Sequence, residues 1–69
     1  MRIDEIKLAV LMAKKRLNLT QLSELSGISR TTLSLAKAGK RIKPETIAII
    51  ANALEVDIND LIENQWPTN

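Results

Sequence analysis

Glycines and helix-capping residues divide the middle of the chain into short segments, and this spacing limits the fold more than any other feature. Asn18 is a good N-cap, because its side chain can accept hydrogen bonds from the free N–H groups that open a helix. Ser29 can do the same for the next segment. Gly27 and Gly39 are the only glycines in the sequence, and glycine readily takes the left-handed conformation that ends many helices. The spacing predicts two short helices joined by a tight turn, at residues 19–26 and 30–38.

Three further helices are predicted around this pair, so we expect an all-α, five-helix fold. No stretch of useful length alternates between apolar and polar residues as a half-buried strand does. Acidic residues begin the first helix and basic residues end it, as the helix dipole favours, while Pro44 and Asp57 suit the starts of the other two. These helices span residues 3–16, 44–54 and 57–63. Residues 1–64 then form one compact domain, and residues 65–69 form a tail in which Pro67 discourages a helix.

Apolar residues on the inner faces of these helices predict the core. We expect it to contain Leu8, Leu11, Leu17, Leu22, Leu25, Ile28, Leu33, Ile47, Ile50, Ala51, Leu54, Val56, Ile58, Leu61 and Ile62. The helix at residues 3–16 is apolar almost all round, which is wider than the stripe of a surface helix. We therefore expect this helix to be central, or to be covered by the C-terminal segment or a second subunit.

Composition excludes several classes of function. The 69 residues include no cysteine and no histidine, so disulfides and Ser/His or Cys/His catalysis are excluded, and a zinc site is not expected. We expect no metal, no cofactor and no enzymatic activity. The apolar run at residues 8–13 is too short to cross a membrane, and the N-terminus lacks the charge order of a signal peptide. We therefore expect a cytoplasmic protein.

Charge is distributed unevenly along the chain. Residues 1–44 contain all ten Lys and Arg residues but only three of the eight acidic residues, and residues 45–69 contain the other five. Between Leu25 and Pro44 there are five basic residues and no acidic one. This asymmetry indicates a surface that binds a polyanion such as nucleic acid. A solvated basic face without a partner would produce the same asymmetry.

The segment "NLTQLSELSGISRTTLSLAKAG", residues 18–39, has the pattern of a helix-turn-helix motif. Leu22 can pack inward from the first helix, and Ile28 and Leu33 can pack against it from the turn and the second helix. Ser23 is small enough for the two helices to approach each other. Because Leu33 packs against the first helix, we expect the second helix to present its opposite face outward, where the motif contacts DNA.

The same residues resemble the phage repressor and Cro family of lambda-repressor-like helix-turn-helix domains. The landmarks are "LNLTQLSELSGIS" around the turn, "AGKR" after the second helix and "ANALEVDINDLI" near the C-terminus, and the resemblance runs from Leu8 to Ile62. It implies a transcriptional regulator, in particular a repressor, that binds a palindromic double-stranded DNA operator as a homodimer. The alternative is a protein-interaction module on the same fold, antitoxin-like or an adaptor, that binds DNA only non-specifically.

The resemblance also implies which residues contact DNA. The residues expected to read bases in the major groove are Arg30, Thr31, Ser34 and Leu35. The residues expected to contact phosphates are Asn18, Ser29, Lys37, Lys40, Arg41 and Lys43. Arg30 suits guanine, and Leu35 suits a thymine methyl group. The alternative for Leu35 is partial burial against the first or the fourth helix.

The sequence departs from the family pattern at three positions. Leu19 stands where a phosphate-binding glutamine is common, so that contact is lost or replaced. Met12 and Lys37 stand where some members have an arginine and a glutamate that form an internal ion pair. Because a buried charge without its partner is costly, replacing both residues avoids that cost. We predict that Met12 packs against the aliphatic part of Lys37, whose ammonium group reaches solvent.

Trp66 is the only aromatic residue in the sequence, and aromatic residues are enriched at protein interfaces. We expect Ile58, Ile62 and Trp66 to contribute to a dimer interface. Alternatively, Trp66 folds back over the apolar face of the helix at residues 3–16, near Ile3, Ile6 or Val10.

Overall fold

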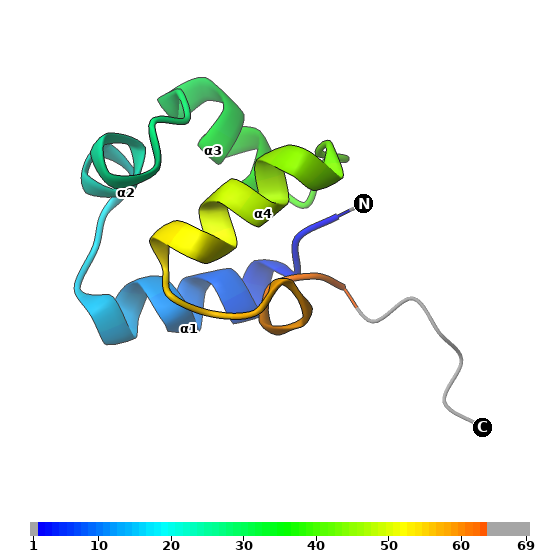
Figure 1. Ribbon diagram of the computed structural model, residues 1–69, viewed down its shortest axis with the longest axis horizontal. Coiled ribbons are helices and arrows are strands. Elements are labelled where there is room, and N and C mark those ends of the chain that lie inside the picture. Colours follow the sequence, from blue (N-terminus) through cyan, green and yellow to red (C-terminus); the bar gives the residue numbers. More distant parts are fainter. Residues whose placement is uncertain (1, 64–69) are drawn as a thin grey trace.

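The computed structural model describes residues 2–63, where four α-helices and one 3-10 turn enclose a single core. Their bounds are α1 (Glu5–Lys15), α2 (Leu19–Ser26), α3 (Arg30–Lys37), α4 (Pro44–Ala53) and the turn η1 (Ile58–Asp60). In Figure 1, α1 and α4 cross the body of the molecule, and α2 and α3 lie along one edge. The predicted all-α fold is confirmed. Trp66 and the rest of the predicted tail lie outside the described residues.

Side-chain caps set the starts of the first three helices, and those at Asn18 and Ser29 were predicted. The Asp4 carboxylate accepts hydrogen bonds from the backbone N–H groups of Ile6 and Lys7, at 2.9 and 3.1 Å. This cap starts α1 at Glu5, two residues later than predicted. Asn18 and Gln21 form the predicted capping box, in which each side chain accepts from the other residue's backbone N–H. These contacts satisfy donors that a helix start leaves unpaired.

The N-terminal segment lies between the loop that follows α3 and the C-terminal segment. Arg2 forms an isolated antiparallel bridge with Arg41, and Ile3 forms another with Ile62. The backbone N–H of Asp4 donates to the Leu61 carbonyl at 2.7 Å. The sequence pattern did not predict these two bridges, because they join residues that are far apart along the chain.

The fifth helix predicted at residues 57–63 is wrong, because only η1 forms there. Asp57 and Asp60 make a capping box, as a helix start would. The chain then leaves the helical path, and the backbone N–H of Glu63 donates to the Arg2 carbonyl at 3.0 Å. Pairing with the N-terminal segment thus takes the place of further helical turns.

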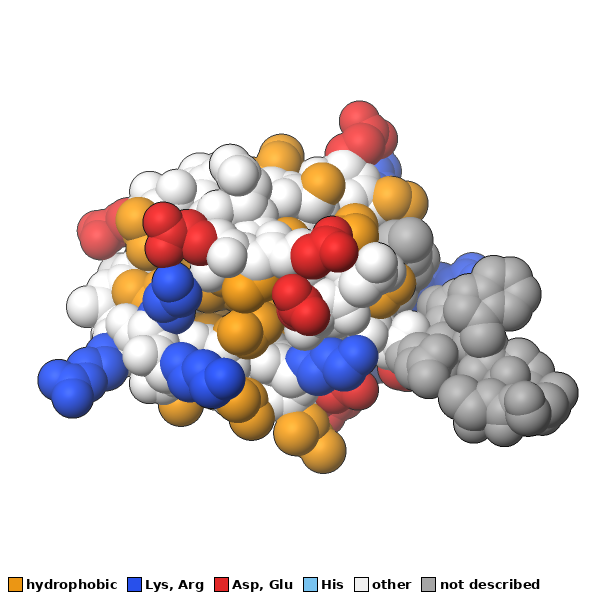
Figure 2. All heavy atoms as spheres, turned by 60° about the horizontal axis from the view of Figure 1, so that its bottom comes forward, with side chains coloured by type: hydrophobic (Ala, Val, Ile, Leu, Met, Phe, Trp, Pro, Cys, Tyr) orange, Lys and Arg blue, Asp and Glu red, His pale blue; other side chains and the backbone are white. Residues whose placement is uncertain are grey.

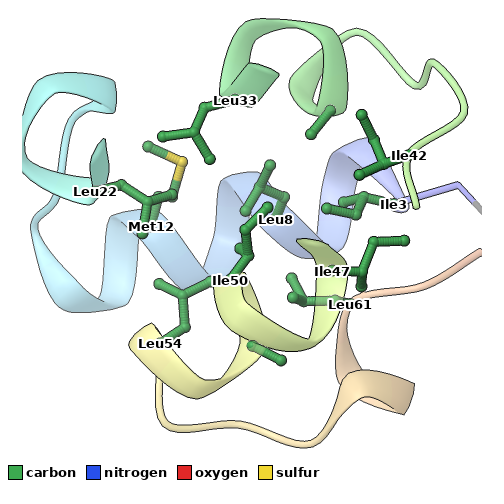
Figure 3. Packing of buried hydrophobic residues seen from close by; sticks show 12 residues of the cluster. Ile3, Leu8, Met12, Leu22, Leu33, Ile42, Ile47, Ile50, Leu54 and Leu61 are labelled. Atoms are coloured by element: carbon green, nitrogen blue, oxygen red, sulfur yellow. The ribbon is translucent and has the colours of Figure 1, made fainter. Parts of the chain in front are cut away.

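The core is formed by apolar side chains from all four helices and from the terminal segments (Figure 3). Its predicted members that are buried are Leu8, Leu22, Leu33, Ile47, Ile50, Ala51, Leu54 and Leu61. The buried residues that the sequence did not predict are Ile3, Met12, Ala36 and Ile42. The predicted members that are only partly buried against the cluster are Leu11, Leu17, Ile28, Val56, Ile58 and Ile62. Leu25 is a wrong prediction, since it is 59% exposed.

The outer face of α1 is not covered by any described residue. Ile6 is 75% exposed and Val10 is 47% exposed. Together with Leu11 and Val56 they line a groove between α1 and the segment after α4, whose rim includes Lys7, Lys14, Asn59 and Asp60. Figure 2, which brings this side of the molecule forward, shows hydrophobic side chains beside Lys and Arg. Helix α1 therefore packs against the core on one face, while its opposite face is exposed.

Candidate nucleic-acid interface

The connection between α2 and α3 is a tight turn around Gly27. Gly27 has φ of +77°, and a Cβ added there would meet no atom within 4 Å. The turn therefore requires glycine for its left-handed backbone and not for space, since such a conformation costs other residues roughly 1–2 kcal/mol. This matches the position at which the sequence predicted the end of the first helix of the motif.

Two serines hold this turn in place. The Ser23 hydroxyl donates to the Ile28 carbonyl at 2.6 Å. The Ser26 hydroxyl donates to the Leu22 carbonyl at 2.7 Å and accepts from the Ile28 N–H at 3.1 Å. Ser23 was predicted only to be small, and Ser26 was not singled out. Their hydrogen bonds fix the angle at which α3 leaves α2.

The recognition helix α3 has one buried face and one exposed face. Leu33 and Ala36 are buried in the core. With about 3.6 residues per turn, the four residues predicted to read bases fall on the opposite side, and all four are exposed: Arg30, Thr31, Ser34 and Leu35. Leu35 is 46% exposed and is not among the side chains that pack against the core, and both its contact with DNA and the alternative of partial burial stay predictions.

Three of these residues border a shallow depression. Arg30, Thr31 and Ser34 from α3 line it together with Leu19, the first residue of α2. The depression therefore combines a guanidinium, two hydroxyl groups and one isobutyl group. Leu19 is the residue that stands where the family commonly has a phosphate-binding glutamine. Its apolar side chain gives this surface a contact for a methyl group instead of a donor for a phosphate.

The residues predicted to contact phosphates lie at two helix starts and in the loop after α3. Asn18 caps α2 through its Oδ1, which leaves its amide N–H groups as donors for a phosphate. Ser29 accepts from the Thr32 N–H at 3.2 Å and donates to the Thr32 hydroxyl at 3.0 Å. Its hydroxyl proton is thus engaged within the cap. The remaining four predicted residues are all exposed: Lys37, Lys40, Arg41 and Lys43.

Met12 and Lys37 have different environments. Met12 is buried, and Figure 3 shows it beside Leu22 and Leu33. Lys37 is exposed, and Ala36 is the α3 neighbour that enters the core. The burial of Met12 agrees with the sequence hypothesis, whereas its packing against the stem of Lys37 stays a prediction. An arginine at residue 12 would need a partner in this apolar cluster.

The residues predicted for a dimer interface are divided between the core and the undescribed tail. Ile58 and Ile62 are half-buried and pack against the protein's own core. Trp66 lies outside the described residues. The alternative contact of Trp66 with Ile3, Ile6 or Val10 therefore stays a prediction. Ile6 and Val10 remain exposed.

The ion pair found within residues 2–63 lies away from the recognition helix. Lys15 Nζ and Glu55 Oε1 are 2.9 Å apart. The hydrogen bond from Lys15, and then its charge, lower the pKa of the Glu55 carboxyl below its ordinary value. The part of the chain that the structure describes contains no group of three or more potential metal ligands among its acidic residues. It also contains no helix long and apolar enough to span a membrane.

Comparison with known proteins agrees with this geometry. The two helices and their turn, with a polar face on the second helix, define a helix-turn-helix DNA-binding fold. The family model of the Cro/C1-type HTH DNA-binding domain matches residues 7–65. The chain therefore belongs to the Cro/C1-type helix-turn-helix family, and the resemblance to repressors and Cro proteins is confirmed.

One curated relative and one solved structure extend this result. The chain is 38% identical over 60 residues to the uncharacterized HTH-type transcriptional regulator YozG of Bacillus subtilis (strain 168), covering 84% of this chain and 71% of that protein. It also matches a structure of a hydroxyethylphosphonate dioxygenase Y98F mutant, with a TM-score of 0.82 and 27% identity. That match covers 97% of this chain but only 15% of the dioxygenase chain. The helix-turn-helix fold therefore also occurs as a small part of a larger protein.

Proposed function

We propose that the protein is a sequence-specific transcriptional regulator, acting as a repressor, that reads the major groove of double-stranded DNA with α3. The observation that carries this proposal is the exposed α3 face around the depression lined by Leu19, Arg30, Thr31 and Ser34. Membership of the Cro/C1-type family supports DNA binding. The named relative supports a role in transcription.

The chemistry of the depression favours particular base contacts. Arg30 has the fork of donors that pairs with guanine O6 and N7. Thr31 and Ser34 can each donate to or accept from a base edge. Leu19 and Leu35 supply apolar contact, which suits the C5-methyl group of thymine. We therefore propose a half-site that contains both a guanine and a nearby thymine.

We also propose that the protein binds as a two-fold dimer to two half-sites about one helical turn apart. The apolar groove on α1 supports an interface on this side of the molecule, because Ile6 and Val10 have no cover among the described residues. In our proposal, Ile58, Ile62 and Trp66 contribute to the same interface. The two copies then present two identical recognition helices to the two halves of a palindromic DNA site.

Selection of duplexes from a random pool, followed by fluorescence anisotropy, tests the proposed function. We expect one palindromic sequence to be enriched, and we expect its affinity to fall steeply with salt, since each neutralised phosphate releases a counterion. Enrichment of no sequence, with equal affinity for all duplexes, would favour the alternative of a protein-interaction module. In that case, the five acidic residues within residues 45–69 would bind a basic partner protein.

We propose a role without catalysis for this chain. The sequence contains neither His nor Cys, so it lacks the commonest general base and the strongest nucleophile. The match to a dioxygenase covers only 15% of that protein, and the shared part is the helix-turn-helix fold.

A further inference from the structure

Arg2 and Arg41 lie opposite each other, although 38 residues separate them between their positions in the printed sequence. They form an antiparallel bridge. Residues directly opposite in an antiparallel pair have Cβ atoms about 4.5–5.5 Å apart, and their side chains project from the same face. The fold therefore places the bases of two arginine side chains next to each other on one face.

The residues that follow each arginine show which face this is. Ile3 follows Arg2 and is fully buried, and Ile42 follows Arg41 and is also buried. Successive residues of an extended segment point to opposite faces. Both arginines are accordingly exposed, and their shared face is the solvent face of the bridge.

The charge around this pair is not balanced. Two like charges directly opposite each other destabilise a pair of strands. In the same register, Glu63 follows Ile62 and lies across from Arg2, and its N–H donates to the Arg2 carbonyl at 3.0 Å. The salt bridge found within residues 2–63 joins Lys15 and Glu55 and involves neither arginine. A second acidic residue, Glu5, has its carboxylate against Gly39, two residues before Arg41. Arg2 and the loop together contribute four basic residues (Arg2, Lys40, Arg41 and Lys43), against the two acidic residues Glu5 and Glu63.

We propose that Arg2 and Arg41 together bind one phosphate of the DNA backbone beside the recognition helix. Guanidinium groups bind phosphate oxygens through paired N–H donors, so two of them can hold one phosphate from two sides. Arg41 lies in the loop that follows α3, and Figure 1 shows the N-terminus beside this loop. Arg2 is then a DNA contact that sequence spacing does not reveal. This inference rests on the proposed DNA-binding function.

The position of Arg2 is fixed before DNA arrives. Ile3 fills the core below it, and two backbone hydrogen bonds join residues 2 and 4 to residues 63 and 61. A phosphate contact from a held residue loses less conformational entropy than one from a free terminal residue.

The test is fluorescence anisotropy with a labelled duplex, across a series of salt concentrations. The variants are Arg2→Gln, Arg41→Gln, the double variant, and Lys15→Gln as a control of equal charge change, since Lys15 pairs with Glu55 away from the DNA surface and from the α1 groove. Losing one phosphate contact should weaken binding about fivefold at physiological salt and lower the salt slope by about one. Because both arginines hold the same phosphate, the double variant should bind little more weakly than either single variant.

A second measurement uses the free protein. If the arginines repel each other without DNA, either single Gln variant should have a melting temperature above that of the wild type. Glu63→Gln should bind DNA more tightly than the wild type, because it removes the carboxylate that competes with phosphate. A lower melting temperature in both arginine variants would overturn the proposal, since it would show that the pair stabilises the fold.

Other outcomes are equally decisive. Unchanged affinity and salt slope in Arg2→Gln would overturn the proposal, and so would an equal loss in Lys15→Gln. If the loss of affinity in the double variant equals the product of the two single losses, the arginines contact two separate phosphates, and the proposal of a shared site is overturned. A random-sequence duplex is titrated in parallel, because phosphate contacts do not depend on sequence. The arginine pair can therefore be tested even if selection enriches no operator and the proposed function fails.

Discussion

The exposed face of α3 and the exposed face of α1 both carry large apolar side chains, but these side chains have different neighbours. On α3, Leu35 is accompanied by the hydrogen-bonding side chains of Arg30, Thr31 and Ser34. On α1, Ile6 and Val10 line a groove with two further apolar residues, Leu11 and Val56. A surface of mixed donors suits base edges in DNA, whereas a cluster of exposed apolar side chains suits a protein partner. The neighbours, and not the apolar residues themselves, distinguish the two surfaces.

The largest expected effect separates the two faces of α3 itself. Leu33→Ala should lower the free energy of unfolding by about 2–5 kcal/mol, because Leu33 is fully buried in the core. Leu35→Ala should change the free energy of unfolding by about 0.5 kcal/mol or less, since that side chain is exposed. Urea denaturation measures both. Similar losses in the two variants would mean that Leu35 is part of the core and not of the DNA surface.

The next effect concerns the polar part of the α3 surface. Arg30→Ala should weaken binding to the selected operator by about 1–3 kcal/mol, if Arg30 makes a bidentate contact with guanine. Its affinity for random duplexes should fall much less, so specificity should decrease. Anisotropy titrations of both duplexes provide the measurement, and Lys15→Ala, outside both surfaces, is the control. An equal loss of affinity for both duplexes would indicate that Arg30 contacts a phosphate and not a base.

A smaller effect is expected for the apolar α1 surface. The double variant Ile6→Ser with Val10→Ser should weaken dimerisation by roughly 1–2 kcal/mol, as truncation of interface residues commonly does. The fold should be nearly unchanged, because both residues are exposed. Sedimentation equilibrium compares this variant and Trp66→Ala with the wild type. If the wild type sediments as a monomer at all concentrations, the proposed dimer must be abandoned.

The smallest effect lies away from both surfaces, at Glu55. Lys15 lowers the pKa of this carboxyl below its ordinary value of 4.5, so the pair stabilises the folded state above that pH. The contribution is lost as pH falls through the lowered pKa, where the carboxylate takes up a proton. Glu55→Gln should therefore slightly lower the melting temperature at neutral pH. The difference from the wild type should vanish in strong acid, and a difference that persists there would have another cause.

Local signals allowed much of the fold to be predicted from sequence. The caps at Asn18 and Ser29 depend on residues three positions away, and Gly27 needs only its own backbone freedom. Leu22 and Leu33 follow from helical periodicity. Leu25 was misplaced because its spacing from Leu22 fits an apolar stripe, although no other element covers that part of α2.

Contacts between distant residues account for what could not be predicted. Ile3 and Ile42 are buried because the terminal segment pairs with the loop after α3 and with Ile62. The same pairing ends the predicted fifth helix and places Arg2 beside Arg41. No periodicity within a short window contains this information. Arg30, Thr31 and Ser34 were found because the family resemblance adds knowledge of which helix face meets DNA.

The pairing of residues 2–4 with residues 61–63 also affects the order in which the chain can fold during synthesis. Ile3 leaves the ribosome before all four helices, but its bridge partner Ile62 emerges only after α4 and η1. All residues of the helix-turn-helix segment, 18–39, have been synthesised well before Ile62. Long-range contacts form late because closing a large loop costs entropy. The nascent domain therefore exposes part of its apolar core until Leu61 and Ile62 are available, and the last few described residues complete the fold.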